Sequence, residues 1–390
     1  MQLTDRKILL CVSGGIAAYK AIDLVSRLTK QGASVRTIMT EGALKFVSPI
    51  NFAALSGEAV HTSLFEDSDP IPHINLADWA DLMIIAPATA NVLAKAAHGI
   101  SDDLLSATLL AHNKPVLFVP AMNVHMYENA ATQDNIKILK ARGHHVLEPD
   151  SGMLACGYEG KGKYPPNEEI VFAIETYLEH SQDCKGLKVL VTAGACEEAI
   201  DPMRYITNRS SGKMGLAIAR AFALRGAEVD LLFAGIDQAV PYNLHSASKH
   251  LSADSMHKAV SEKYHMQDVI VMCAAVSDYT PDNVRQKKIK KGGKLNLELV
   301  PTVDILEELG RKVDKPRQKL IGFAAETEDL LKNARKKLEK KNLDLIVVNH
   351  IRVAGMDDTV VDFVTRQEAV HAEGTKLNIA NMLVDIVKAL

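Results

Sequence analysis

The chain has 390 residues, of which 47% are hydrophobic and 24% are charged, and its formal net charge is −3. This length favours two domains, and the composition is that of a globular protein, which excludes disorder over the whole chain. The slightly negative charge argues against nucleic-acid binding, and no run approaches the roughly 18 consecutive apolar residues of a membrane span. Five scattered cysteines without a C-x-x-C pair argue against a disulfide framework or a zinc cage. The same cysteine pattern fits a reducing cytoplasm, where we expect this protein. Because a strand-like run begins at about Lys7, we expect no signal peptide.

The first half alternates short apolar runs with segments of helical period, which is the pattern of a parallel α/β fold. After Glu148 a glycine-rich segment breaks this alternation, and we expect a loop there that holds Gly152, Gly157, Gly160 and Gly162. The predicted strands are Ile8–Val12, Ser34–Met39, Leu82–Ala86 and Val116–Val119, and the predicted helices are Ile16–Lys30 and about Glu168 to Leu178.

At Lys188 the pattern starts again. Residues 188–194 repeat the order of residues 7–14, which is a lysine, an apolar strand, a small hydroxyl residue and a glycine turn. We therefore predict an α/β fold of two doubly wound, Rossmann-like domains with mostly parallel sheets, joined near residues 180–187. Further strands are expected at Val229–Phe233, Val269–Cys273 and Leu345–Val348, and a helix at Gly215–Leu224.

Three loops follow predicted strands in the first half, at the place where open parallel sheets bind ligands. The turn at Ser13–Ile16 opens a helix whose N–H groups favour a phosphate, although its spacing is not G-x-G-x-x-G. Residues 86–91 and 120–123 follow the next two strands. Each loop taken alone is compatible with a purely structural turn, but together they predict a mononucleotide site.

Two further side chains of the first half have a functional and a bland interpretation. His73 lies near the start of a predicted short helix, where a histidine is usually a surface or capping residue. Cys156 lies in the glycine-rich loop, where its thiol could reach a ligand or be an unreactive loop cysteine. The spacing alone does not separate these alternatives.

In the second half, Ser210-Ser211-Gly212 precedes a predicted helix without the spacing of a Walker A loop. The segment is either an ordinary N-cap or a phosphate site. Two basic runs, at residues 285–294 and 335–341, are either solvated faces or part of a triphosphate site. The first run carries a glycine pair, which predicts a mobile loop.

Residues 7–180 resemble the flavin-dependent cysteine decarboxylases, and among them the 4'-phosphopantothenoylcysteine decarboxylases. The resemblance rests on residues 13–20, 73–74, 86–91, 120–127 and 155–157. It implies FMN bound between the subunits of a trimer-based homo-oligomer, which is often a dodecamer. The residues implied around FMN are Ser13, Gly14, Gly15, Ile16, Thr40, Thr89, Ala90, Asn91, Ser106 and Ala121, and Asp102 stands where Asn is common.

The same resemblance implies roles in an oxidative decarboxylation in which the flavin supplies the redox chemistry. His73 would be the acid/base group, and Asn123 with Met126 would hold the substrate and orient its carboxylate. Cys156 would protonate the enethiolate that remains after loss of carbon dioxide, which gives 4'-phosphopantetheine.

Residues 186–390 resemble the phosphopantothenate–cysteine ligases, on residues 201–215, 274–279, 288–291, 322–327 and 341–344. The resemblance implies that CTP with Mg²⁺ activates a carboxylate as an acyl-cytidylate, from which the amine of cysteine displaces CMP. Asn208 would hold the activated acyl group, and Lys288 would stabilise charge at the phosphate. The implied substrate-binding residues are Arg204, Ser210, Ser211 and Gly212, and the implied CTP-binding residues are Asp278, Lys288, Val303, Asp304, Ile305, Phe323, Lys337 and Lys341.

The two resemblances imply a bifunctional enzyme, with a decarboxylase domain at residues 1–180 and a ligase domain at residues 186–390. Its partners would be 4'-phosphopantothenate, cysteine and CTP, with neither nucleic acid nor membrane. Cys196-Glu197 and Pro301-Thr302-Val303 depart from the ligase pattern. One alternative is therefore an active decarboxylase with a weakened ligase. The other is a regulatory binding protein, against which the retention of His73, Asn123 and Cys156 argues.

Overall fold

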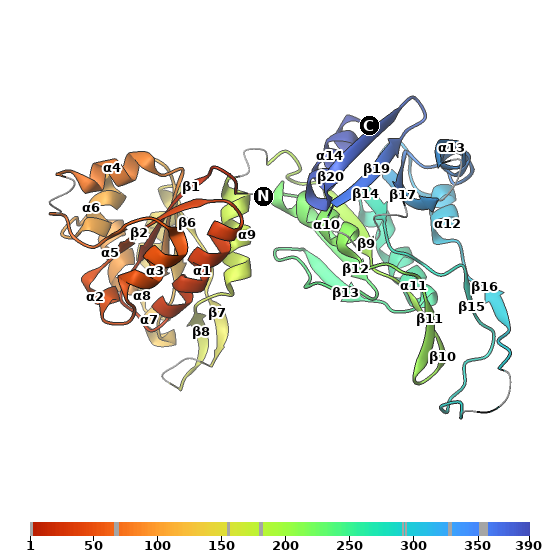
Figure 1. The fold of residues 1–390 in the computed structure, drawn as a ribbon, viewed down its shortest axis with the longest axis horizontal. Coiled ribbons are helices and arrows are strands. Elements are labelled where there is room, and N and C mark those ends of the chain that lie inside the picture. The colour runs from red at the N-terminus through yellow and green to blue at the C-terminus, as the bar shows by residue number, and fades with distance from the viewer. Residues whose placement is uncertain are drawn as a thin grey trace. The chain divides into compact units, whose positions relative to one another are not determined.

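The computed structural model describes residues 3–65, 70–153, 157–178, 182–290, 292, 295–326, 330–350 and 358–390. The chain divides into two compact units, unit 1 at Met1–Leu178 and unit 2 at Glu179–Leu390, each with its own sheet (Figure 1). Within the described residues, no helix has both the length and the apolar character to cross a membrane.

Unit 1 is built on a six-stranded sheet in the order β3-β2-β1-β4-β5-β6, with every neighbouring pair parallel. The four strands predicted from apolar runs are confirmed, and two short edge strands are added. The strands are β1 (Lys7–Val12), β2 (Ser34–Met39), β3 (Val60–His61), β4 (Leu82–Ala88), β5 (Val116–Pro120) and β6 (His145–Val146).

Both faces of this sheet are buried, which explains why its strands read as unbroken apolar runs. In β1, Ile8 and Leu10 point to one hydrophobic core, whereas Leu9 and Cys11 point to the other. The first core is closed by α1 (Ala18–Lys30), α3 (Pro49–Ser56) and α9 (Asn167–Leu178), and the second by α4 (Pro72–Trp79), α5 (Ala90–His98), α6 (Leu104–Ala111) and α8 (Ala130–Ala141). The short helices α2 (Glu41–Leu44) and α7 (Val124–Glu128) follow strand ends.

Unit 2 has an eight-stranded sheet in the order β13-β12-β9-β14-β17-β18-β19-β20. The first six strands are parallel and the last two are antiparallel, so the predicted mostly parallel sheet is confirmed. The strands are β9 (Lys188–Ala193), β12 (Glu228–Phe233), β13 (Ser246–Lys249), β14 (Val269–Met272), β17 (Lys319–Glu326), β18 (Leu345–His350), β19 (Asp358–Val364) and β20 (Ala369–Thr375).

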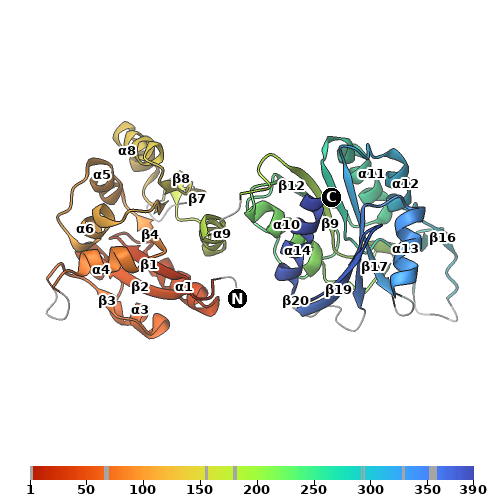
Figure 2. The ribbon, with the colours of Figure 1, turned by 90° about the horizontal axis from the view of Figure 1, so that it is seen from above.

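Helices cover both faces of this second sheet, as Figure 2 shows. α10 (Lys213–Leu224) and α14 (Lys376–Ala389) lie against one face. α11 (Ala253–Lys263), the 3₁₀ turn η1 (Tyr264–Met266), α12 (Ile305–Lys312) and α13 (Leu330–Lys340) lie on the other side. α10 begins two residues before the predicted helix, because Gly212 is its N-cap.

The repeated lysine strand marks the same structural position in both units. β1 and β9 each lie third in a run of six parallel strands. The N–H of Lys7 donates to Asp81 Oδ2 at 2.9 Å, and that of Lys188 donates to Asp268 Oδ2 at 2.9 Å. Each aspartate returns its own N–H to the lysine carbonyl at 2.8 Å. The sequence echo therefore reflects one way of starting a central strand.

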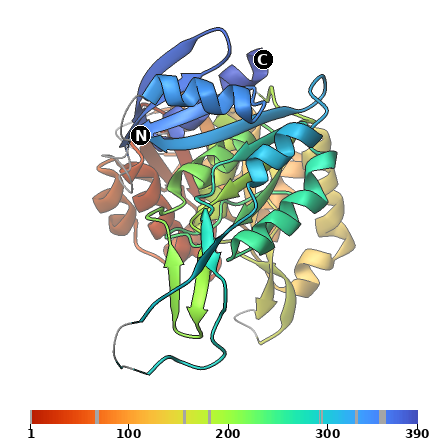
Figure 3. The same ribbon diagram turned by 90° about the vertical axis from the view of Figure 1, so that its right-hand side faces the viewer.

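Three antiparallel hairpins lie outside the main sheets. The loop predicted after Glu148 is wrong, because β7 (Asp150–Met153) pairs there with β8 (Glu159–Lys163). β10 (Glu197–Asp201) pairs with β11 (Arg204–Thr207), and β15 (Tyr279–Pro281) pairs with β16 (Leu299–Pro301). The described part of residues 279–301, called the arm below, extends from the sheet alongside the β10–β11 hairpin (Figure 3).

A cluster of charges fixes the start of unit 2 to its helices. The Arg225 guanidinium, of which only 8% is exposed, donates to both carboxylate oxygens of Asp183, at 2.9 and 2.6 Å. It also donates to Asp385 on α14 at 2.6 Å, and Lys388 pairs with Asp183. Asp183 is therefore held by cations from two sides.

Replacing Asp183 by Asn tests this anchor through its pH dependence. Hydrogen bonds from Arg225 hold the pKa of Asp183 well below its ordinary value, against the opposing effect of burial and with help from Lys388. Such a carboxyl stabilises the folded state above its unfolded pKa of about 3.9, and this contribution is lost as the pH falls through the folded-state value. We expect Asp183→Asn to lower the Tm at pH 7, and the difference from wild type to shrink below about pH 4.

Scanning calorimetry of the full chain between about pH 3 and pH 8 measures this difference. Asp358→Asn, which neutralises an exposed carboxylate at the start of β19, is the matched control. A Tm difference for Asp183→Asn that stays constant over this range would contradict the anchor.

Candidate functional sites

The first candidate site lies where the strand order of unit 1 reverses, at the carboxyl ends of β1 and β4. Ser13 follows β1 and is buried, and its Oγ donates to Pro87 O at 2.7 Å. The N–H of Thr89 donates to the same Oγ at 3.1 Å. One hydroxyl therefore joins the loops that follow these two strands.

A third loop meets them through a close backbone approach. A Cβ on Gly14 would lie 2.6 Å from the carbonyl carbon of Gly42, so no other residue fits there without a shift. Thr40 follows β2 and N-caps α2. The loops after β1, β2 and β4 thus meet beside the N-terminal end of α1, where the positive end of the helix dipole favours an anion.

The other residues predicted around the flavin lie mainly at helix starts. Thr89 N-caps α5, with Ala90 and Asn91 in its first turn. The N–H of Ala121, after β5, donates to the last residue of β4 at 3.2 Å. Ser106 is buried near the start of α6, where its hydroxyl forms a capping box with Asp103. The hydroxyl of Ser106 therefore already has a structural role.

His73 lies in the first turn of α4, as predicted, and is half-buried. Its Nδ1 is buried and has no hydrogen-bond partner in the part of the chain that the structure describes. At the other end of the helix, the Arg36 guanidinium lies 4.5 Å from the centre of the Trp79 ring. Because a buried nitrogen without a partner is costly, this atom is available to exchange a hydrogen bond or a proton with a ligand.

The β7–β8 hairpin lies directly against the loop that follows β5. The N–H of Met122 donates to Gly162 O at 2.9 Å, and the rings of His125 and Tyr158 meet edge to face at 5.1 Å. In the same loop, Asn123 Oδ1 accepts the N–H of His125 at 2.8 Å and N-caps α7. Met126 is 49% exposed. Cys156, between the two hairpin strands, falls outside the described residues.

These residues fit a flavin that carries a phosphate. The turn at Gly14 and Gly15 lies at the start of a helix, and a Cβ on Gly15 would meet only Thr89 Cγ2, at 3.7 Å, so the backbone at Gly15 is open to a ligand. Ile16 is 63% exposed at this turn and offers an apolar surface. The unpartnered Nδ1 of His73 adds a group that a ligand would satisfy.

The second candidate site lies at the equivalent edge of unit 2. Ala195, after β9, forms bridges to Gly235 after β12 and to Ala275 after β14. The neighbouring Cys196 is fully buried in the hydrophobic core, and burial raises the pKa of its thiol to about 12. The Cys196 side chain is thus a core group and does not face a ligand.

The Ser-Ser-Gly segment opens α10 beside this loop. Gly212 has φ +73°, and a Cβ on it would lie 2.5 Å from Ile236 Cγ2, so the N-cap requires glycine. Asn208 Nδ2 donates to Val276 O at 3.3 Å. Asn208, Ser210 and Ser211 therefore lie between β11 and α10, next to the loop after β14, and their assignment to the acyl group and to the substrate stays a prediction.

Of the residues predicted to bind the nucleotide, Asp278, Val303 and Phe323 lie at the same edge, whereas Lys341 follows α13 near the amino ends of the strands, where the N–H of Asp344 donates to Leu320 O at 3.0 Å. The N–H of Thr302 donates to Asp278 O at 2.9 Å, which brings Val303 beside that loop. Asp304 N-caps α12 and pairs with Lys341 Nζ at 2.8 Å. The remaining predicted residues are Ile305 in the first turn of α12, the half-buried Phe323 on β17 beyond the end of β14, and Lys337 one turn before Lys341.

The departures from the family pattern thus leave the helix cap at Asp304 intact. Across the described ranges of the chain, no group of three or more His, Cys, Asp or Glu side chains is arranged to hold a metal ion.

Lys288 lies on the arm and not in the strand-end loops. The predicted substrate residue Arg204 is exposed, and its guanidinium binds Asp201 at 2.7 Å and Ile289 O at 3.2 Å. Asp201 was not among the residues predicted for either site, although an aspartate followed by proline and, two residues later, arginine is a signal for such a turn.

The approach of β8 to the Met122 loop can be tested with glycine substitutions. A Cβ on Gly162 would lie 2.4 Å from Met122 O, so we expect Gly162→Ala to destabilise unit 1 by about 1–3 kcal/mol. Gly152 has the same φ of +146°, but its nearest neighbour, Lys163 Nζ, would lie 3.8 Å away. Gly152→Ala therefore controls for backbone strain alone.

Chemical denaturation and hydrogen exchange of residues 157–163 measure the effect. Equal destabilisation by the two variants would show that the contact with Met122 contributes nothing.

Comparison with known proteins divides the chain in the same way. Residues 1–179 match the family model described as Flavoprotein, and residues 184–390 match that of the DNA/pantothenate metabolism flavoprotein C-terminal domain. The coenzyme A biosynthesis bifunctional protein CoaBC of Bacillus subtilis (strain 168) is 50% identical over 358 residues, which cover 90% of this chain and 88% of that protein.

Two further relatives carry the same name. That of Haemophilus influenzae is 43% identical over 355 residues, with 90% of this chain and 88% of that protein covered. That of Mycolicibacterium smegmatis is 45% identical over 364 residues, with 89% and 87% covered. In both halves and over most of its length, the chain therefore belongs to the family of coenzyme A biosynthesis bifunctional proteins, as its two resemblances predicted.

Proposed function

We propose that this chain makes 4'-phosphopantetheine in two steps, a CTP-dependent ligation of cysteine to 4'-phosphopantothenate and an FMN-dependent decarboxylation of the product. Residues 186–390 carry out the ligation, and residues 1–180 carry out the decarboxylation. The observation that supports this most is family membership over both halves, each of which has polar residues gathered at the carboxyl edge of its sheet.

The ligation makes an amide from a carboxylate that has no good leaving group. A carboxylate oxygen of 4'-phosphopantothenate attacks the α-phosphorus of CTP, pyrophosphate leaves, and an acyl-cytidylate forms. The amine of cysteine then attacks the acyl carbon, the bond from this carbon to the phosphate oxygen breaks, CMP leaves with the electron pair of that C–O bond, and the amine loses a proton to solvent.

The residues at the edge of the second sheet suit this sequence. Ser210, Ser211 and Gly212 bind an anionic group at the start of α10, with Arg204 as a further substrate contact. Asn208 holds the acyl group for attack by the amine, and Lys288 stabilises charge on the phosphate. Mg²⁺ accompanies CTP, and the CTP-binding residues are Asp278, Lys288, Val303, Asp304, Ile305, Phe323, Lys337 and Lys341.

In the decarboxylation, FMN would supply the redox chemistry, as acceptor and then donor of two electrons at the substrate carbon that carries the thiol. The loops at Ser13–Ile16, Thr40, Thr89–Asn91 and Ala121, with Ser106, hold the flavin. His73 exchanges the proton through an imidazole whose Nδ1 has no partner within the described residues. Asn123 and Met126 orient the substrate carboxylate, and Cys156 returns a proton to the enethiolate.

The rival interpretations are less well supported. The buried position of Cys196 means that this departure leaves the exposed edge of the second site unchanged, which argues against a weakened ligase. A purely regulatory protein would have no use for a costly unpartnered nitrogen at His73. We further propose that the enzyme works in the cytoplasm as a homo-oligomer, with a dodecamer as the expected form.

Mass spectrometry of the full chain with 4'-phosphopantothenate, cysteine, Mg²⁺ and either CTP or ATP tests the proposal. Formation of 4'-phosphopantetheine with release of CMP is the expected result. Accumulation of phosphopantothenoylcysteine in the wild type would contradict the decarboxylase assignment, and no CMP would contradict the ligase assignment.

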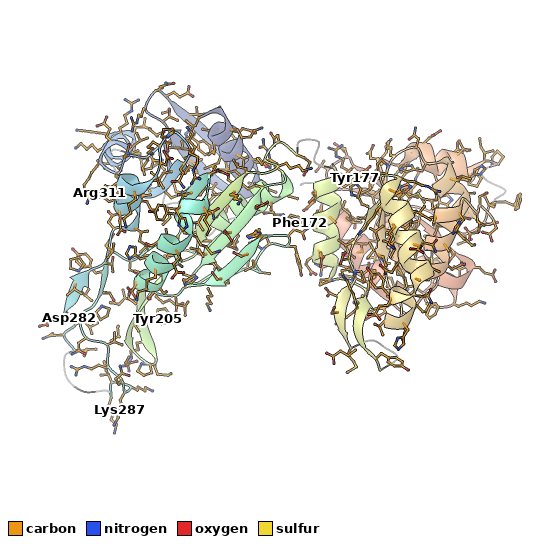
Figure 4. All side chains as sticks on the ribbon, turned by 180° about the vertical axis from the view of Figure 1, so that it is seen from behind. Phe172, Tyr177, Tyr205, Asp282, Lys287 and Arg311 are labelled. Carbon is orange, nitrogen blue, oxygen red and sulfur yellow. The ribbon has the colours of Figure 1, made fainter. Side chains whose placement is uncertain are left out.

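Two variants should separate the steps. His73→Asn is expected to lower decarboxylation by at least about 100-fold, because a positioned acid/base group is lost, and to leave CMP release unchanged. Lys288→Ala is expected to lower CMP release and to leave decarboxylation of supplied phosphopantothenoylcysteine unchanged. Lys287→Ala, which removes the neighbouring charge at the far end of the arm, is the matched control (Figure 4). Equal loss of CMP release in Lys287→Ala and Lys288→Ala would contradict the assigned role of Lys288.

A further inference from the structure

A single carboxylate organises the turn of the β10–β11 hairpin. The side chain of Asp201 is fully buried, and its Oδ1 accepts the N–H groups of Met203 and Arg204 at 2.8 and 2.9 Å. Its Oδ2 accepts Arg204 Nη1 at 2.7 Å and the N–H of Ile289, in the arm, at 3.1 Å. Burial alone would raise the pKa of this carboxyl, but these donors outweigh burial and hold the pKa below its ordinary value. Asp201 is therefore an anion at neutral pH.

The backbone of Ile289 is hydrogen-bonded through both its N–H and its carbonyl. While its N–H donates to Asp201, its carbonyl accepts Arg204 Nη1 and Nη2 at 3.2 Å each. Asp201, Arg204 and the Ile289 peptide thus close a ring of charge-assisted hydrogen bonds, the stronger kind in proteins. The N–H of Arg285 also donates to Ile200 O at 3.0 Å, so the arm is tied to the hairpin at two points.

The clamped peptide lies between Lys288 and Lys290 in the chain. The rest of the arm projects beyond this point, with Lys287 at its far end (Figure 4). A lysine on such a segment has many orientations unless its backbone is fixed, and ordering it only when substrate binds would cost conformational entropy.

We infer that Asp201 is a positioning residue of the ligation, which fixes the backbone of the Lys288 segment through the Ile289 peptide. This inference rests on the proposed role of Lys288. Asp201 makes its contacts through the backbone of the arm and the Arg204 side chain, and it acts on the reaction through these groups.

The test uses the full chain with Asp201→Asn, Asp201→Ser, Lys288→Ala and the double variant Asp201→Asn/Lys288→Ala. An amide has one acceptor oxygen where the carboxylate has two, so Asn cannot hold both the turn and the Ile289 peptide. Serine keeps an acceptor for the turn N–H groups but is shorter by one atom. Asp282→Asn, an exposed carboxylate on the same arm, is the matched control.

We expect both Asp201 variants to lower the rate of CMP release by about 10- to 100-fold, the size of effect that a misplaced group produces. On the Lys288→Ala background, Asp201→Asn should cause no further loss, because residues that act as one unit are not additive. Hydrogen exchange over residues 285–290 should quicken at least about tenfold, since a hydrogen bond to a charged acceptor is lost. Decarboxylation of supplied phosphopantothenoylcysteine and the rates of Asp282→Asn should not change.

The outcomes separate this inference from the function on which it rests. No CMP from the wild type overturns the proposed ligation, and exchange over residues 285–290 still reports whether Asp201 holds the arm. Unchanged exchange in either Asp201 variant overturns the clamp. Losses that multiply in the double variant overturn action through Lys288. Faster exchange in β9 and β14 would show that a variant has unfolded unit 2. In that case the Asp201 variant in which β9 and β14 still exchange slowly is used to test the clamp.

Discussion

The burial of both faces of each central strand is the constraint on which the rest of the molecule depends. In β1 and β9 every residue after the first is almost completely buried, so a polar side chain along these strands needs a hydrogen-bond partner, which Thr192 has in the N–H of Ala274 at 3.0 Å. Polar chemistry is displaced to the carboxyl ends, where Ser13 follows one strand and Gly194 follows the other. Because the strand order reverses beside β1 and β9, loops from both neighbours reach the same edge. Two different sites are therefore built on the same arrangement of strands and strand-end loops, one in each unit.

The sequence could predict this arrangement because the arrangement follows from local patterns. Apolar runs such as Leu82–Ala86 identify a strand buried on both faces, and the repeated Lys7 and Lys188 segments identify the central strand of each sheet. The strand-end loops could be predicted as well, since parallel strands bring their carboxyl ends to one edge. The family resemblance then added roles for His73 and Asn208 that no spacing could supply.

The hairpins could not be predicted, because their stability comes from contacts distant in the sequence. β8 consists of one glutamate, two glycines and two lysines, so it shows no apolar alternation. It is held by a hydrogen bond to the backbone of Met122. β10 and β11 depend on Asp201, whose partner Ile289 is 88 residues further on. Composition indicated only loops at these places. The capping bond of Ser106 and the buried side chain of Cys196 could not be predicted from the sequence either, because both depend on which way a side chain points.

The place of Trp79 at the end of α4 gives the protein an optical property of its own. Trp79 is the single tryptophan of the chain, and it lies at the end of the helix whose first turn carries His73. All tryptophan emission therefore originates from one helix of unit 1. A yellow flavin absorbs in the region where tryptophan emits, so a flavin bound near this helix quenches that emission by energy transfer. The chain thus contains a built-in fluorescent reporter for flavin occupancy, with no tryptophan in unit 2 to obscure it.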